Sequence, residues 1–164
     1  MQQILHLLFA LTVISLTFCD SSAAEDLTIG GLFCLSGDCS SDGTQSLRGV
    51  ELAIEEQNNR GGVLGRTLKL VVEDTREGSG GVDAVTAFKK LRADPQIRIF
   101  VGPTWSTAAQ ALAPIIAKDH EIMAISPTVG VSAYHLAGSN IFNSRGTSEA
   151  TTRALAKLAR DKGL

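Results

Sequence analysis

Hydrophobic residues recur along this chain in two different spacings, and segments with one spacing alternate with segments with the other. In 66–74 apolar residues alternate with polar ones, as in a half-buried strand, whereas 106–120 places them three and four positions apart, as on one face of a helix. Strands are predicted at 26–33, 66–74, 97–102, 122–126 and 140–145, and helices at 44–62, 84–91, 106–120 and 147–163. This alternation predicts an α/β fold with an open parallel sheet, helices on both faces and right-handed crossovers.

The first 24 residues follow a different pattern. Residues 4–18 are almost entirely apolar, which is short for a membrane span and typical of the central part of a signal peptide. The small residues Ser22 and Ala24 stand at positions −3 and −1 of a cleavage site after Ala24. We therefore expect residues 1–24 to be a signal peptide and 25–164 to be the exported domain; the alternative is a buried N-terminal helix.

Cysteines are few, and each has more than one interpretation. Cys19 would carry the lipid of a bacterial lipoprotein, but Phe18 is larger than the residue that normally precedes a lipidated cysteine. Cys34 and Cys39 lie in a loop of Ser, Gly and Asp, and two close cysteines in an oxidising compartment usually pair. Zinc would need more ligands than this loop offers, and redox dithiols are more often spaced C-x-x-C. We expect a Cys34–Cys39 disulfide that braces the loop.

The composition restricts the class of protein but indicates no particular chemistry. The chain has 164 residues, of which 44% are hydrophobic and 20% charged, as is usual for a globular domain. A formal net charge of −2 gives no basic surface for a nucleic acid partner.

Ligands of open parallel sheets bind outside the carboxyl ends of the strands. That rule selects the loops at 34–43, 75–81, 102–106 and 126–130. The third loop leads straight into a helix, where the hydroxyls of Ser106 and Thr107 join free backbone N–H groups and the positive end of the helix dipole. This end of the helix is a candidate cradle for a carboxylate or phosphate, although Ser106 could instead only cap the helix.

The 126–130 loop lies at the same predicted edge. Its backbone carbonyls and the Thr128 hydroxyl can accept hydrogen bonds from an ammonium group. Trp105, the only tryptophan of the chain, would form a wall of the pocket or else fill the core. A donor cluster beside an acceptor cluster describes a site for an α-amino acid zwitterion.

Signals for an enzyme are weak. The sequence has no G-x-S-x-G elbow and no G-x4-G-K-[ST] loop. His120 and His135 have no recognisable partner, and Glu73 with Asp74 at a strand end is more typical of solvated or hydrogen-bonded carboxylates than of an acid pair. We expect no catalysis, no cofactor and no metal ion.

Three stretches together resemble a known family. They are "LSGDCSSDGTQSLRGVELAIEEQNNRGGVLGRTLKLVVED" at 35–74, "VGPTWSTAAQALAPIIAKDHEIMAISPT" at 101–128 and "IFNSRGTSEATTRALAKLA" at 141–159. In this order and spacing they are similar to the type 1 periplasmic solute-binding proteins of the leucine/branched-chain amino acid binding family. The resemblance implies a Rossmann-like lobe that captures a branched-chain amino acid in the periplasm and delivers it to an ABC permease in the inner membrane.

The resemblance also implies roles for individual residues. The family's serine after the third strand binds the ligand α-carboxylate, and Ser106 matches it. Groups after "I-S-P" bind the α-ammonium; the matching positions are Thr128 and Gly130, where relatives often carry Thr instead of Gly. Some relatives also have paired cysteines in the first loop, in agreement with Cys34 and Cys39.

Family members have two lobes, and this chain matches the N-terminal lobe, with the second absent. Without the second lobe most of the ligand surface stays exposed, so we expect no amino acid binding by this chain alone that calorimetry can measure. Three alternatives stay open: a ligand-binding region of a receptor or sensor, a short amide or urea as the solute, and a small exported hydrolase.

Overall fold

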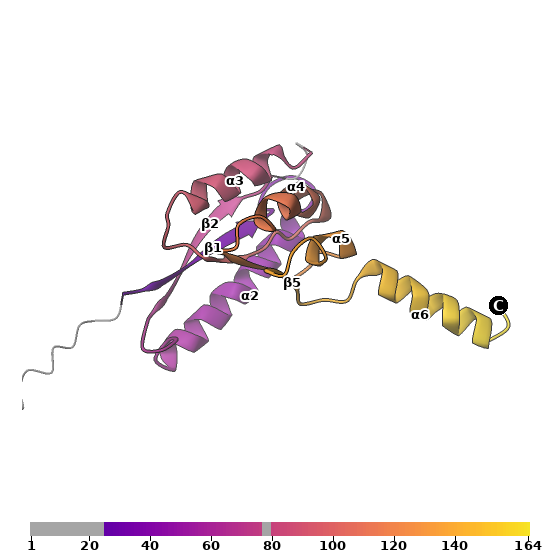
Figure 1. Cartoon of the computed structure of the whole chain (residues 1–164). Helices are drawn as coiled ribbons and strands as arrows, with labels where there is room; N and C mark the ends of the chain where they lie inside the picture. The colour runs from indigo at the N-terminus through magenta and orange to yellow at the C-terminus, as the bar shows by residue number, and fades with distance from the viewer. Residues whose placement is uncertain (1–24, 77–79) are drawn as a thin grey trace, which may run out of the picture.

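A single sheet of five parallel strands forms the centre of the molecule (Figure 1). The computed structural model describes residues 25–76 and 80–164. The strand order is β2-β1-β3-β4-β5, and every neighbouring pair runs parallel. The strands are β1 (Leu27–Phe33), β2 (Leu68–Asp74), β3 (Ile99–Val101), β4 (Met123–Ser126) and β5 (Ile141–Asn143). The predicted open parallel sheet is confirmed.

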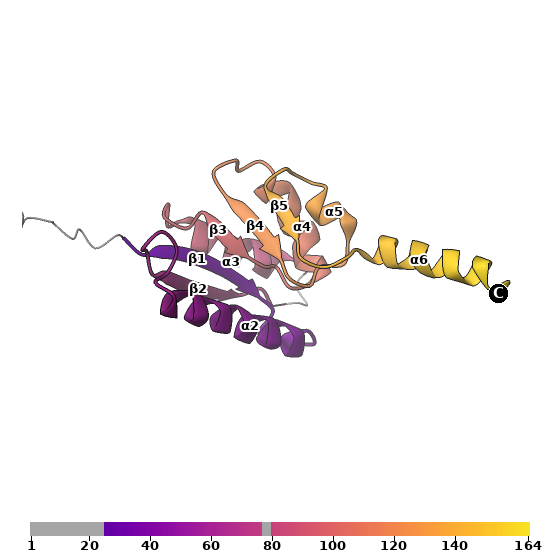
Figure 2. The ribbon, with the colours of Figure 1, turned by 90° about the horizontal axis from the view of Figure 1, so that it is seen from below.

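Helices lie on both faces of this sheet, as the β-α alternation predicts. They are α2 (Ser40–Asn59), α3 (Val82–Arg92), α4 (Ser106–Ile116), α5 (Ser132–His135) and α6 (Ser148–Asp161). Figure 1 shows α2 against one face of the sheet and α3 with α4 against the other. Seen from below in Figure 2, α2 runs along the β1–β2 half, whereas α4 and α5 lie beside β4 and β5.

The core fills the space between the sheet and the α3–α4 layer. Ala84, Ala87, Phe88 and Leu91 follow the helical spacing of α3, and all four are buried. Their partners on α4 are Ala108, Ala109, Leu112, Ala113 and Ile116. Phe88 lies against Phe100 of β3, with ring centroids 5.1 Å apart. Burial of these apolar side chains is the main stabilising term for such a layer.

Most element boundaries differ from the sequence prediction by a few residues, and one helix was not predicted. Helix α2 begins at Ser40 rather than at residue 44, directly after Cys39, which is its N-cap residue. The short helix α5 was not predicted, because four residues give too few positions for a helical spacing to be recognised.

The predicted signal peptide at 1–24 lies outside the described residues. None of the helices in the described ranges is both long and apolar enough to cross a membrane.

Helix α6 stands apart from this layered body. It follows a turn after β5 and extends away from the sheet (Figures 1 and 2). None of its residues is buried, and Leu155 and Leu158 are 60% and 54% exposed. Thr147 caps its first turn by accepting a hydrogen bond from the Ala150 N–H at 3.2 Å.

Candidate functional site

A pocket of about 490 Å³ opens where the carboxyl ends of β3 and β4 meet the start of α4. Four residues selected from the sequence line it: Trp105, Ser106, Thr128 and Gly130. Four others line it that the sequence analysis did not select: Asp42, Thr104, Arg145 and Ser148. Thr107 is exposed one residue further along α4 and is not among the lining residues. The loops after β3 and β4 thus share one rim.

The turn after β3 brings the start of α4 to this pocket. Gly102 has a φ of 117°, and a Cβ there would lie 2.1 Å from the Leu32 carbonyl oxygen, so only glycine fits. The Gly102–Pro103 peptide bond is cis. Thr104 is buried, and its hydroxyl oxygen accepts the Cys34 N–H at 3.0 Å, which joins the turn to the end of β1.

Ser106 is the first residue of α4, and Trp105, in extended conformation, is its N-cap without a side-chain capping bond. The alternative role of Ser106 as the helix cap is therefore not observed. Within the described part of the chain the Ser106 hydroxyl has no hydrogen-bond partner. It stands at the positive end of the helix dipole together with backbone N–H groups that have no helical acceptor. This combination is suited to an anionic group such as a carboxylate.

The turn after β4 is tied to the turn after β3 by two side-chain hydroxyls. Ser126 donates a hydrogen bond of 2.8 Å to the Pro103 carbonyl oxygen and accepts the Val129 N–H at 3.0 Å. The Thr128 hydroxyl donates to the Thr104 carbonyl oxygen at 2.6 Å. Thr128 therefore uses its proton within the protein, and only the lone pairs of its oxygen are left for a ligand.

Residues after β5 close the third side of the pocket. The Arg145 guanidinium donates to the Thr128 carbonyl oxygen at 2.9 Å, and the Ser148 N–H donates to the Gly130 carbonyl oxygen at 2.8 Å. A Cβ on Gly130 would lie 2.8 Å from the Ser148 Oγ. The absence of a side chain at residue 130 thus makes room for the Ser148 hydroxyl.

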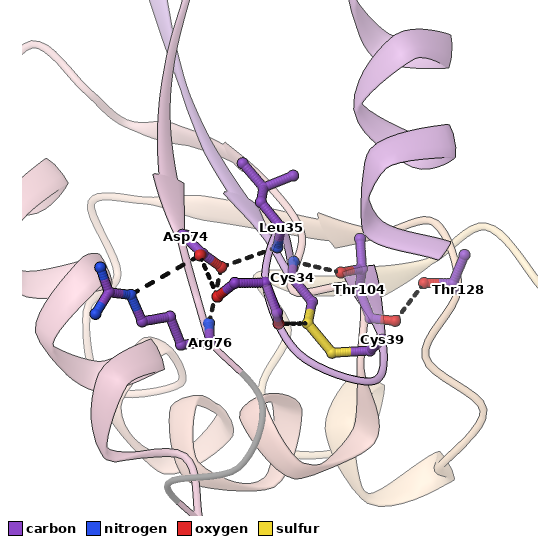
Figure 3. The surroundings of a disulfide bond; sticks show 8 residues. Cys34, Leu35, Cys39, Asp74, Arg76, Thr104 and Thr128 are labelled. Atoms are coloured by element: carbon purple, nitrogen blue, oxygen red, sulfur yellow. Dashed lines mark hydrogen bonds and ion pairs between the residues drawn. A yellow bond between two sulfur atoms is a disulfide. The ribbon is translucent and has the colours of Figure 1, made fainter. Parts of the chain in front are cut away.

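The cysteine loop borders the same rim, and Figure 3 shows its contacts. Cys34 and Cys39 are bonded to each other in the structure, with their Cα atoms 5.9 Å apart. The Asp74 carboxylate accepts the Leu35 N–H at 2.8 Å and the Ser36 hydroxyl at 2.6 Å. These contacts hold the loop between β1 and α2, and with it the first turn of α2 that carries Asp42.

Asp74 has an ionisation that matches this structural role. Burial would raise the pKa of its carboxyl, but hydrogen bonds from Ser36, Leu35 and Arg76 outweigh burial and lower the pKa below 3.8. Its neighbour Glu73 forms an ion pair of 2.7 Å with Lys90. Both carboxylates are therefore engaged in structural contacts, as the sequence analysis favoured. Among residues 25–76 and 80–164, no three His, Cys, Asp or Glu side chains gather closely enough to hold a metal ion.

Comparison with protein families places residues 26–164 within the model of the periplasmic binding protein family. The Leu/Ile/Val-binding protein BraC3 of Rhizobium johnstonii is 34% identical over 124 residues, which are 76% of this chain and 32% of the relative. The Leu/Ile/Val-binding protein of Escherichia coli is 29% identical over 114 residues, 70% of this chain and 30% of the relative. The chain thus spans about a third of the length of these curated relatives.

Solved structures show the same likeness. The branched-chain amino acid transporter substrate-binding protein LivJ of Streptococcus pneumoniae, in complex with isoleucine, superposes with a TM-score of 0.66 and 26% identity, over 74% of this chain and 34% of LivJ. A solute-binding protein of an ABC transporter from R. palustris, in complex with 4-hydroxybenzoate, gives a TM-score of 0.71 at 21% identity, over 85% of this chain and 36% of that one. The second likeness concerns the fold alone.

Proposed function

Because the chain belongs to the type 1 periplasmic binding proteins, in the leucine/branched-chain amino acid binding family, we propose that it acts as the solute-binding component of an ABC importer. Its ligand in this proposal is an amino acid of the branched-chain type. The observation that carries the proposal is the meeting of Ser106 and Thr128 at one pocket at the strand ends. A catalytic role is not part of the proposal.

The start of α4 receives the ligand carboxylate in this proposal. The Ser106 hydroxyl is without an internal partner in the described residues, so it can donate to a carboxylate oxygen. The first backbone N–H groups of α4 point the same way as the helix dipole, and both favour an anion. Trp105, which is 39% exposed, offers its ring to the apolar part of the ligand.

This lobe would act with a second one. Small-molecule sites usually bury most of the ligand surface, and the pocket described here opens to solvent at Trp105 and Arg145. We therefore assign to this chain the charged end of the ligand, with the carboxylate at the start of α4, and assign most of the remaining ligand surface to a second lobe. The ABC permease in the inner membrane is the proposed partner of the loaded protein.

Export to the periplasm completes the proposal. Residues 1–24 would direct the chain across the inner membrane, and the oxidising periplasm would allow the Cys34–Cys39 bond to form. The bond then braces the loop that leads into the first turn of α2, where Asp42 lines the pocket.

Trp105 provides the experiment, because it is the only tryptophan in the chain and lines the pocket. Because a single lobe should bind too weakly for calorimetry, the ligand has to be present at millimolar concentrations, where we expect L-leucine to change the Trp105 fluorescence in a saturable way. Ser106→Ala should weaken this response about tenfold, since a hydrogen bond to a charged group is lost. Thr107→Ala is the matched control: it removes a neighbouring hydroxyl of the same helix that does not line the pocket, and it should leave the response unchanged. Equal responses of wild type and Ser106→Ala would contradict the proposal.

A further inference from the structure

Two charged side chains line the pocket, and the proposed carboxylate site uses neither of them. Asp42 approaches from the first turn of α2, and Arg145 from the turn between β5 and α6. They come from segments far apart in the sequence and carry opposite charges. Charged side chains in a ligand pocket decide which ligands can enter, because every charge must find a partner when water is excluded.

Asp42 has no internal partner to neutralise it. Within residues 25–76 and 80–164, its carboxylate forms neither a hydrogen bond nor an ion pair, and the residue is exposed at the rim. Asp42 lies in the first turn of α2, and its carboxylate oxygens accept no hydrogen bond from another residue of the described ranges. An ionised carboxylate at a pocket rim attracts cationic groups and hydrogen-bond donors.

Arg145 is bonded only to a neutral group. Its guanidinium donates to the Thr128 carbonyl oxygen at 2.9 Å, and it forms no ion pair in the described residues. A guanidinium has five N–H donors, so several stay available after this single bond. Arg145 and Asp42 do not pair with each other either. The pocket therefore has a separated positive and negative pole.

The position of Arg145 also changes where a ligand ammonium can bind. The Thr128 carbonyl oxygen already accepts a hydrogen bond from a cation, and Gly130 offers no hydroxyl. The Arg145 Nη2 lies 3.9 Å from the place that a Cβ of Gly130 would take. A ligand ammonium at Thr128 and Gly130 would thus meet a like charge at close range.

We propose that Asp42 and Arg145 determine specificity in this pocket: Asp42 binds the cationic group of the ligand, and Arg145 binds its carboxylate together with Ser106. The ligand class is a small zwitterion with separate ammonium and carboxylate groups. This assignment rests on the proposed function and moves the ammonium from Thr128 and Gly130 to Asp42.

The test uses three probes with the same branched carbon end: L-leucine, 4-methylpentanoate, which lacks the ammonium, and 3-methylbutylamine, which lacks the carboxylate. Each is titrated at millimolar concentration into the full chain, with Trp105 fluorescence as the readout. Asp42→Asn should weaken the binding of L-leucine and of the amine about tenfold and leave the binding of 4-methylpentanoate unchanged. Arg145→Gln should weaken the binding of L-leucine and of 4-methylpentanoate about tenfold and leave the binding of the amine unchanged.

Matched controls separate local charge from net charge and folding. Asp38→Asn and Arg48→Gln remove the same charges from exposed positions that do not line the pocket, and neither should alter binding. Arg145→Lys keeps the charge and should keep the preference for probes with a carboxylate. Thermal unfolding of every variant shows that the fold is retained.

The possible results distinguish this inference from the proposed function. If L-leucine binds in a Ser106-dependent way but Asp42→Asn or Arg145→Gln binds it like the wild type, the inference is overturned and the proposed function stands. Equal affinity of the wild type for L-leucine and 4-methylpentanoate also overturns the inference. If the wild type responds to none of the three probes, both proposals fail.

Discussion

The Thr128 hydroxyl donates a hydrogen bond of 2.6 Å to the carbonyl oxygen of Thr104, which joins the turn after β4 to the turn after β3. Both residues line the candidate pocket, and Figure 3 shows the bond between them. Thr104 in turn accepts the Cys34 N–H, so the ends of β1, β3 and β4 are connected through one residue. The relative position of the three loops is therefore fixed by side chains of the pocket itself.

Removal of this hydroxyl should loosen the rim. Thr128→Val keeps the shape of the side chain but leaves the Thr104 carbonyl oxygen without this donor, which should lower the free energy of unfolding by about 1 kcal/mol. Thr128→Ser retains the hydroxyl, so its free energy of unfolding should fall by less. Urea denaturation followed by circular dichroism measures both, and equal stability of wild type and Thr128→Val would show that the bond contributes nothing net.

Two glycines of α2 should respond in opposite directions to the same substitution. A Cβ on Gly43 would lie 1.7 Å from the Cys34 carbonyl oxygen, so Gly43→Ala has to displace backbone and should cost at least about 2 kcal/mol. Gly49 has no atom within 4 Å of such a Cβ, and Gly49→Ala should stabilise the helix by about 1 kcal/mol. Denaturant unfolding of both variants measures these changes in the free energy of unfolding. A stabilised Gly43→Ala variant would contradict the close packing of α2 on β1.

The Cys34–Cys39 bond should be detectable without a structure. Material from an oxidising compartment should have a mass about 2 Da below that of the dithiol form, with no titratable thiol from this pair after denaturation. Replacing both residues by Ser should lower the free energy of unfolding by about 2 kcal/mol, because a short closed loop is released in the unfolded chain. Two free thiols in that material would refute the pairing.

Asp74 should make the free energy of unfolding depend on pH. Its pKa in the folded protein is lowered from 3.8, so on acidification the unfolded chain takes up this proton first. The stabilisation by Asp74 is thus complete well above pH 4 and is lost as the pH falls through the folded pKa below 3.8. Asp74→Asn should be about 1–2 kcal/mol less stable than wild type at neutral pH, and this difference should shrink as the pH falls toward 3.

Urea midpoints measured from neutral to acid pH provide the comparison for Asp74. Asp38→Asn serves as the control, because Asp38 lies in the loop that Asp74 holds but its carboxylate has no hydrogen bond within the described ranges. A constant difference between wild type and Asp74→Asn at all pH values would contradict the role assigned to its hydrogen bonds.

The sequence predicts best what depends on local spacing. The buried face of α3 follows from apolar residues three and four positions apart, and the placement of Ser106 and Thr128 follows from the rule that parallel strands end at one edge. Asp42 and Arg145 could not be predicted in this way, because their meeting depends on how α2 and the turn after β5 approach the rim. The start of α2 at Ser40 was not predicted, because residues 40–46 contain no apolar side chain and the helical spacing begins only at Leu47.

Helix α6 has a consequence for how the chain behaves over time. This helix of 14 residues buries no side chain, and its hydrogen bonds to the rest of the protein are at its first two residues, from the Ser148 N–H to Gly130 and from the Ser132 hydroxyl to Glu149. Beyond them it depends on its own backbone hydrogen bonds, at a length close to the limit of about 12–15 residues below which isolated helices are marginal in water. Its amide hydrogens should therefore exchange with deuterium long before those of β1 and β3. Trypsin, which cleaves after Arg153, Lys157 and Arg160, should digest α6 while the sheet remains intact.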